Sequence, residues 1–147
     1  MAFSGDYMCD SFKLQLLTAE HDFAVAGDSF KIALYTDTAT LDNTTTAYTA
    51  TGELTATGNY TTTGQALTNI APSWNTTGGA AAICDFEDEV FSNASFSAMG
   101  ALIYNDTHAS DAAVIVLDFA TLQTATAGDF TIQFPVAAAT TAIIRIA

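Results

Sequence analysis

The densest group of ionisable side chains lies between Asp85 and Glu89, where the sequence reads Asp-Phe-Glu-Asp-Glu. In a strand, Asp85, Glu87 and Glu89 would point to the same side, and three carboxylates on one side can bind Ca²⁺. The segment has neither the ligand spacing nor the glycine of an EF-hand loop. We therefore favour a solvated loop of an acidic chain over a cation site.

The two histidines, His21 and His108, are not spaced as zinc ligands, and the two cysteines do not form a Cys-X-X-Cys pair. Asp106, His108 and Asp111 could form an acid–base group, but polar residues this close together are far more typical of a turn. The sequence also has no Gly-X-Ser-X-Gly, Gly-X-Gly-X-X-Gly or Walker motif. We predict no enzymatic activity, no catalytic residue, no metal ligand and no cofactor.

Trp74 is the best single candidate for a contact residue, because Pro72 beside it predicts an exposed edge strand. One interpretation is a sugar-stacking platform, as in carbohydrate-binding modules, formed by Trp74 and the tyrosines Tyr7, Tyr35, Tyr48, Tyr60 and Tyr104. The alternative is that the tyrosines cap the edges of the core with their hydroxyl groups in water. Trp74 could equally contact a neighbouring protein subunit.

The N-terminal segment is unusually apolar for a chain end, with Phe3, Tyr7, Met8 and Phe12 close together. Chain ends are normally polar and poorly ordered, so an apolar arm is expected to dock, either on its own domain or on a neighbour. These four residues and Trp74 are the predicted binding residues for a contact with another protein or another subunit.

The composition excludes several classes of partner. The chain has 147 residues and a net charge of −13, from 16 acidic and 3 basic residues. Nucleic acid and anionic membranes are excluded as main partners, because both require clusters of lysine and arginine. The cations Lys13, Lys31 and Arg145 lie far apart in the sequence. The length predicts one domain.

The sequence shows neither a signal peptide nor an apolar run long enough to span a bilayer. We therefore expect that the chain is made and kept in a cytoplasm, or that it is exported by a route other than a cleaved signal. Cys9 and Cys84 are too few for a disulfide framework and are predicted to be reduced, buried thiols.

Helical spacing is confined to the start of the chain, where residues 11–20 are predicted to form one short helix with Asp10 and Ser11 as its N-cap. The expected strands lie at 30–36, 54–63, 67–74, 80–86, 96–104, 112–119, 130–134 and 143–146, with a long loop over 37–51 and Gly128-Asp129 just before the strand at 130–134. Seven or eight short strands separated by turns are typical of an all-β fold, a β-sandwich or jelly roll. We divide the chain into an N-terminal arm with a short helix, residues 1–28, and a β-sandwich domain, residues 29–147.

Several sequence blocks resemble small virion proteins of tailed bacteriophages, many of them from marine and cyanobacterial phages. The most distinctive block is Gly100-Ala-Leu-Ile-Tyr-Asn-Asp106. The others begin at Ser11 (Ser-Phe-Lys-Leu-Gln-Leu-Leu), Phe30 (Phe-Lys-Ile-Ala-Leu-Tyr-Thr), Thr46 (Thr-Ala-Tyr-Thr), Ala113 (Ala-Val-Ile-Val-Leu-Asp-Phe), Gly128 (Gly-Asp-Phe-Thr-Ile-Gln-Phe-Pro) and Ile143 (Ile-Ile-Arg-Ile). The resemblance implies a head decoration (cement) protein, commonly an oligomer on the capsid surface, with the major capsid protein as its partner.

Three functions remain as hypotheses, and the first is a capsid decoration protein on the exterior of the virion. At three-fold points of a shell, symmetry would make a homotrimer natural. The second hypothesis is a tail or baseplate component, or a module that binds host glycans through Trp74. The third is a glycan-degrading enzyme, which we disfavour because no recognisable pair of catalytic carboxylates is present.

Overall fold

The structure, a computed structural model, describes residues 3–147. In this range the chain forms two antiparallel sheets and one helix, α1. The elements are β1 (Tyr7–Met8), α1 (Asp10–Leu17), β2 (Phe30–Tyr35), β3 (Gln65–Ala66), β4 (Asn69–Asn75), β5 (Ala81–Phe86), β6 (Glu89–Asn105), β7 (Ala112–Ile132) and β8 (Ile144–Ile146). The prediction of an all-β fold with a short N-terminal helix is confirmed, and the two sheets are consistent with a β-sandwich of about eight strands.

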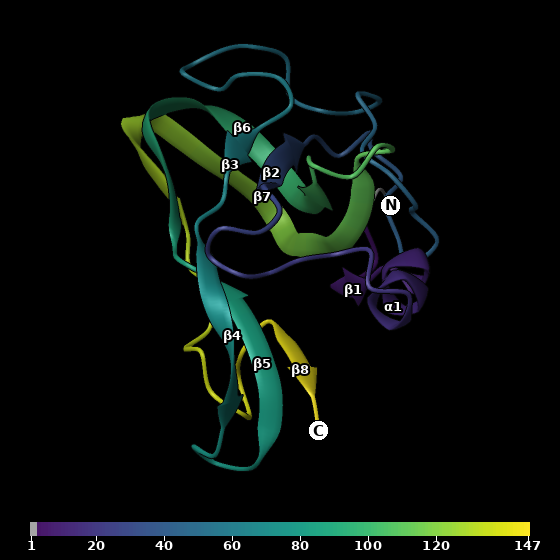
Figure 1. Cartoon of the computed structure of the whole chain (residues 1–147). Helices are drawn as coiled ribbons and strands as arrows, with labels where there is room; N and C mark the ends of the chain where they lie inside the picture. Colours follow the sequence, from purple (N-terminus) through teal and green to yellow (C-terminus); the bar gives the residue numbers. More distant parts are fainter. Residues whose placement is uncertain (1–2) are drawn as a thin grey trace.

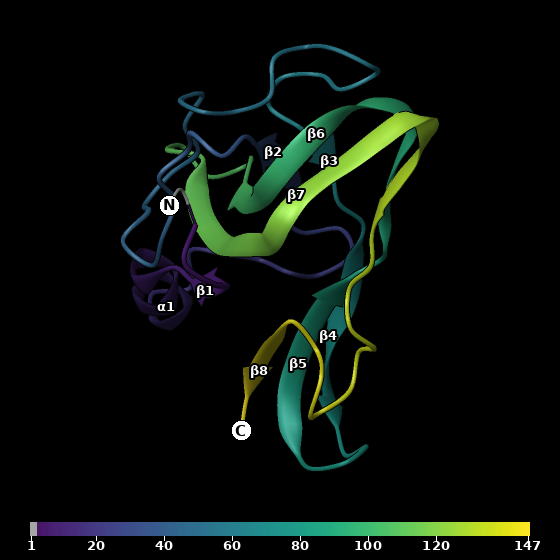
Figure 2. The same ribbon diagram turned by 180° about the vertical axis from the view of Figure 1, so that it is seen from behind.

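The larger sheet has the strand order β1-β7-β6-β2-β3, and the smaller has the order β4-β5-β8. Figures 1 and 2 show the smaller sheet extending away from one end of the larger one. As predicted from Pro72, β4 is an edge strand. The segment after β7 returns along the smaller sheet and ends in β8, which pairs with β5.

The β6–β7 hairpin dominates the larger sheet and is paired from Glu89 opposite Ile132 to Asn105 opposite Ala112. The predicted separation of this region into strands at 112–119 and 130–134 is therefore wrong, because β7 is continuous from Ala112 to Ile132. Ala120 and Ala127 have positive φ angles of 60° and 46°, and the register shifts at several points along the hairpin. Such bulges bend a strand pair without ending it, and the hairpin is visibly bent in Figure 1.

The hydrophobic core follows the β6–β7 hairpin and is most continuous where the hairpin pairs with β2. The first five residues of β7, Ala112 to Val116, are all buried, which confirms a central strand there. Phe30, Ile32 and Leu34 of β2 are also buried, as the alternation of that strand predicted. Beyond Val116, β7 is half-buried or exposed until Ile132, but the facing part of β6 continues the core through the buried side chains of Phe91 and Phe96. Phe130 of β7 packs against both rings.

Two local predictions are wrong. The helix begins at Asp10 and ends at Leu17, and its N-cap is Cys9, which makes no side-chain cap bond. Asp10 instead accepts hydrogen bonds from Lys13 and Asn43. Residues 54–63 form turns instead of a strand, because Gly58 adopts a φ of 51° and its backbone packs so tightly on Ser95 that no side chain fits.

The long segment between β2 and β3 is held by the buried carboxylate of Glu53, which is only 9% exposed. Glu53 accepts hydrogen bonds from the hydroxyl groups of Tyr48 (2.6 Å) and Tyr60 (2.7 Å) and from the backbone N–H of Thr63 (2.6 Å). The hydroxyl group of Tyr104, a residue of β6, donates a hydrogen bond to the carbonyl oxygen of Thr63. A loop without regular structure is thereby fixed to the sheet through side chains.

The predicted N-terminal arm is residues 1–28, and its described part, from Phe3 onward, packs on the predicted β domain, residues 29–147. β1 pairs with β7 through Tyr7 opposite Val116 and Met8 opposite Ile115. Phe3, Phe12 and Phe23 belong to the same hydrophobic core as the central strands. Of the two docking alternatives, the described residues therefore show docking on the same chain.

Both cysteines are free and buried, which confirms that prediction. Burial raises the pKa of the Cys9 thiol to about 11 and that of Cys84 to about 12. Thiolates are the reactive form, so neither residue is activated as a nucleophile. Within residues 3–147, no helix combines the length and the apolar character needed to cross a bilayer.

Candidate functional site: an exposed apolar face and a charged groove

The five predicted contact residues do not form one surface. Phe3 and Phe12 are buried in the core of the same chain, so neither side chain is accessible on the surface of this structure. Tyr7 and Met8 are half-buried in β1. Trp74 is 68% exposed on β4 and is the predicted contact residue that is freely accessible.

The sugar-stacking platform is also wrong. Tyr35 and Tyr104 are buried in the larger sheet, and Tyr60 is buried in the segment between β2 and β3. Tyr35 donates to the carbonyl oxygen of Thr49. Burial raises the pKa of each of these hydroxyl groups above its ordinary value. The alternative, in which the tyrosines lie at the core, describes them better, although their hydroxyl groups bond to the protein rather than to water.

Trp74 is part of an exposed apolar row that crosses the smaller sheet. Trp74 pairs with Ala82, and Ala82 pairs with Ile146, which is 62% exposed. Residues directly opposite in antiparallel strands point to the same side of the sheet, so these three side chains are neighbours. We call them the Trp74 row.

A shallow groove of about 290 Å³ borders the Trp74 row. It separates the smaller sheet from the segment around α1, and its lining includes Leu16, Phe23, Pro72, Cys84 and Ile144. The sequence predicts an exposed Trp74 but not its neighbours Ala82 and Ile146, since the pairing of β5 with β8 joins residues that are far apart in the sequence. The only signal was the apolar character of Ile144 and Ile146.

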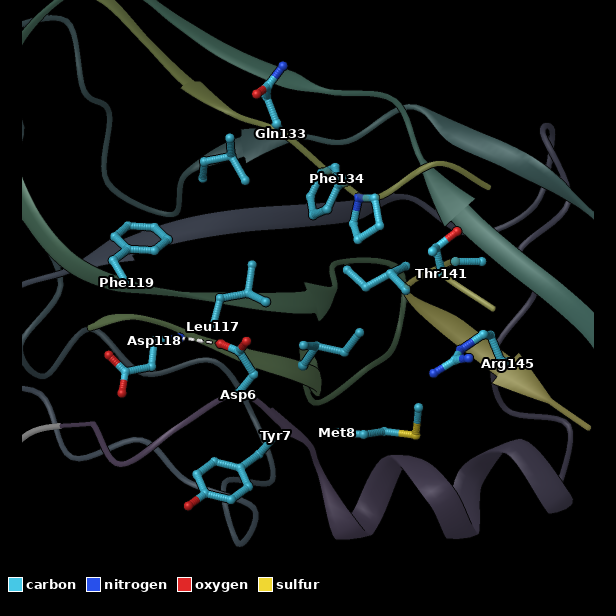
Figure 3. A pocket seen from close by; sticks show the side chains of 15 residues that line it. Asp6, Tyr7, Met8, Leu117, Asp118, Phe119, Gln133, Phe134, Thr141 and Arg145 are labelled. Atoms are coloured by element: carbon cyan, nitrogen blue, oxygen red, sulfur yellow. Dashed lines mark hydrogen bonds between the residues drawn. The ribbon is translucent and has the colours of Figure 1, made fainter. Parts of the chain in front are cut away.

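A second, larger groove of about 480 Å³ lies between the two sheets. Its walls come from β1, the middle of β7, the segment that follows β7, and β8. Apolar side chains in the lining include Met8, Ile115, Leu117, Phe134 and Ile143, while Asp6, Asp118 and Arg145 supply charge. Figure 3 shows Arg145 on the opposite side of the groove from Asp6 and Asp118.

The acidic run does not assemble into a cation site. β5 ends at Phe86 and β6 begins at Glu89, so the carboxylates do not share one strand. Asp85 is buried rather than solvated and accepts hydrogen bonds from the backbone N–H groups of Phe86 and Ile143. Burial raises the pKa of Asp85 despite those bonds. Among residues 3–147, no group of three or more His, Cys, Asp or Glu side chains is placed to hold a metal ion.

The two histidines stack on each other, with ring centroids 5.9 Å apart, where the segment after α1 meets the β6–β7 turn. The side-chain oxygen of Asn105 accepts from the backbone N–H groups of Thr107 and His108, which fixes its amide. The amide nitrogen of Asn105 therefore donates to Nδ1 of His21 (2.9 Å). Nδ1 can accept only when it carries no proton, so this contact requires neutral His21.

Acidification is expected to weaken the fold through His21. Burial lowers the pKa of His21, helped by His108 and opposed by Asp28 and Glu20. The folded chain then binds this proton less readily than the unfolded chain, so the stabilisation is complete above about pH 6.5 and is lost as pH falls through the folded pKa. The check is the free energy of unfolding from pH 7 to 5: its dependence on pH should be smaller in His21→Gln than in the wild type, and equal slopes would contradict the assignment.

Comparison with protein-family models, with curated proteins and with solved structures finds no significant match for the chain. The functional argument therefore depends on the sequence blocks and on the surfaces described above. Those surfaces offer contact with another molecule: an apolar row on one sheet, and a groove with charge at both ends.

Proposed function

We propose that this chain is a structural protein of a tailed-bacteriophage virion, a decoration (cement) protein that binds the outer capsid surface and stabilises the shell. The proposed partner is the major capsid protein, and the proposed location is the capsid exterior after synthesis in the host cytoplasm. The resemblance of the sequence blocks supports this role. The structural observation that carries the proposal is the exposed Trp74 row.

The Trp74 row has the chemistry of a protein contact. Tryptophan is enriched at the centres of interfaces because its large ring buries much apolar surface. The three side chains of the row are uncharged, although the chain has a net charge of −13. A contact made through these three side chains buries apolar surface, and it removes no charged side chain of the row from water.

Self-association is part of the proposal, with a homotrimer as the expected form. A trimer matches the three-fold points of a capsid, where each copy would meet the same shell surface. The net charge of −13 opposes association at low salt, because like charges repel over a distance of about 10 Å at 0.1 M ionic strength. Trimers are therefore expected to be more stable at high salt or when the shell is present.

The proposed contact is tested by Trp74→Ala in an assay of binding to capsids that lack this protein. A central tryptophan contributes about 2 kcal/mol or more to an interface, so the affinity should fall by about thirtyfold or more. Because Trp74 is exposed, the melting temperature should hardly change. The matched control is Leu122→Ala, which removes an exposed apolar side chain from the other sheet and should leave binding intact.

Trp74→Ala also distinguishes capsid binding from the second candidate function, which is binding of a host glycan. The exposure of Trp74 favours this second function as well. A lone exposed indole ring can stack on a sugar as well as pack against a protein. If Trp74→Ala particles carry a full complement of the protein but adsorb poorly to cells, the row binds a host glycan. If neither binding nor adsorption changes, the row is not the functional contact.

A further inference from the structure

The larger groove combines an apolar lining with charge at both ends. In the view of Figure 3, Met8 lies between Asp6 and Arg145, and Leu117 lies beside Asp6. Phe134 lines the opposite wall. Arg145 projects from β8 on one side, while Asp6 and Asp118 lie on the other. A ligand that fills this groove therefore meets a cation, apolar side chains and carboxylates in that order.

Arg145 is the cation without a carboxylate partner in the described part of the chain. Lys13 pairs with Asp10 at 2.7 Å and Lys31 pairs with Asp106 at 2.9 Å. Arg145 donates through Nη1 to the carbonyl oxygen of Thr140 (2.8 Å), and it forms no ion pair with any residue from 3 to 147. In a chain with 16 acidic residues, this leaves most of a guanidinium group available at the larger groove. Guanidinium groups bind carboxylates through paired, charge-assisted hydrogen bonds.

The backbone beside the groove is closed to an added strand. A carboxylate oxygen of Asp6 accepts from the N–H of Asp118 (2.7 Å), and Asp118 in turn accepts from the N–H of Ala120 (2.8 Å). These contacts occupy donors on β7 just beyond its pairing with β1. Charged side chains at an edge also discourage strand addition. Recognition in the groove must therefore use side chains.

We propose that this groove binds an extended segment of a partner protein in which apolar residues separate an acidic residue from a basic one. The acidic side chain binds Arg145, the apolar side chains cover Met8 and Leu117, and the basic side chain faces Asp6 and Asp118. Charge complementarity at both ends fixes the direction of the segment. The inference rests on the proposed function only in placing this segment on a capsid protein.

The test uses the full chain, labelled with ¹⁵N, and two synthetic peptides. One is acetyl-Asp-Leu-Ile-Leu-Lys-amide, and the other replaces Asp and Lys by Asn and Gln. The charged peptide should shift the amide signals of the groove residues in a saturable way. The neutral peptide should bind about tenfold more weakly, because it lacks both ionic contacts.

Three variants locate the contact. Arg145→Gln should weaken binding of the charged peptide about tenfold, and Asp118→Asn should weaken it severalfold while keeping an oxygen for the Ala120 N–H. Lys13→Gln, which removes a cation outside the groove, should leave it unchanged. Arg145→Glu should reject this peptide and bind one with Lys in place of Asp, which shows charge recognition independently of any change in stability.

The proposal is overturned if the charged peptide gives no saturable shifts, if the shifts lie outside the groove, or if Arg145→Gln and Lys13→Gln bind alike. These experiments use the isolated chain, so they fail or succeed separately from the virion role. If the chain binds the peptide but is absent from virions, the groove proposal stands and the proposed function is contradicted. If the chain is abundant in virions but does not bind the peptide, the proposed function stands and the groove proposal is contradicted.

Discussion

Replacing Phe12 by alanine is expected to lower the free energy of unfolding by about 3–5 kcal/mol, because the ring is fully buried and its removal leaves a cavity. Phe12 packs edge-on against Phe23, with ring centroids 6.0 Å apart, and lies 5.0 Å from the ring of His21. Small domains have total stabilities of about 5–15 kcal/mol, so the loss is a large fraction of the whole. Chemical denaturation measures it directly.

The matched control is Leu14→Ala in the same helix, since Leu14 is 65% exposed. Surface substitutions of this kind change stability by about 0.5 kcal/mol or less. Similar losses in the two variants would show that the N-terminal segment is not part of the core. The result also matters for function, because a buried Phe12 cannot serve as a contact with a capsid.

Replacing Glu53 by alanine is expected to cost about 2–4 kcal/mol, because it removes the acceptor of three hydrogen bonds at once. The hydroxyl groups of Tyr48 and Tyr60 and the N–H of Thr63 would lose their partner at a site with little water. Burial and the bond to Glu53 both raise the pKa of Tyr48 and of Tyr60. Thermal and denaturant unfolding give the free-energy change.

Glu53→Gln should recover much of the loss, since its remaining oxygen can still accept from Tyr60 and Thr63. The control is Glu87→Ala, which removes an exposed carboxylate and should be nearly neutral. In Glu53→Ala, the amides of residues 54–63 should also exchange hydrogen faster than in the wild type, because the loop is released. Unchanged exchange there would contradict the role assigned to Glu53.

The fold class followed from the sequence because the strands alternate strongly and are separated by turn residues. The errors occurred where long-range contacts override local pattern. The weak alternation of residues 54–63 resembles a strand, but the chain there follows side-chain bonds to Glu53 and close packing of Gly58 on Ser95. Gly128-Asp129 resembles a turn, but the ladder with β6 continues through it as a bulge.

The candidate site was less predictable than the fold. An exposed Trp74 followed from its neighbour Pro72, because proline is confined to strand edges. Its row with Ala82 and Ile146 depends on strand order, which periodicity does not encode. The charges of the larger groove are equally remote from one another, since Asp6 and Arg145 lie near opposite ends of the sequence. Apolar residues near the start of the chain indicated docking but not its partner.

The measurement that tests the central claim most directly is the copy number of this chain in purified virions, by quantitative mass spectrometry against the major capsid protein. A decoration protein covers the shell, so we expect a copy number comparable to that of the capsid protein. A number lower by about tenfold or more would contradict capsid decoration and indicate the tail or the portal vertex. Absence from the virion would contradict a structural role altogether.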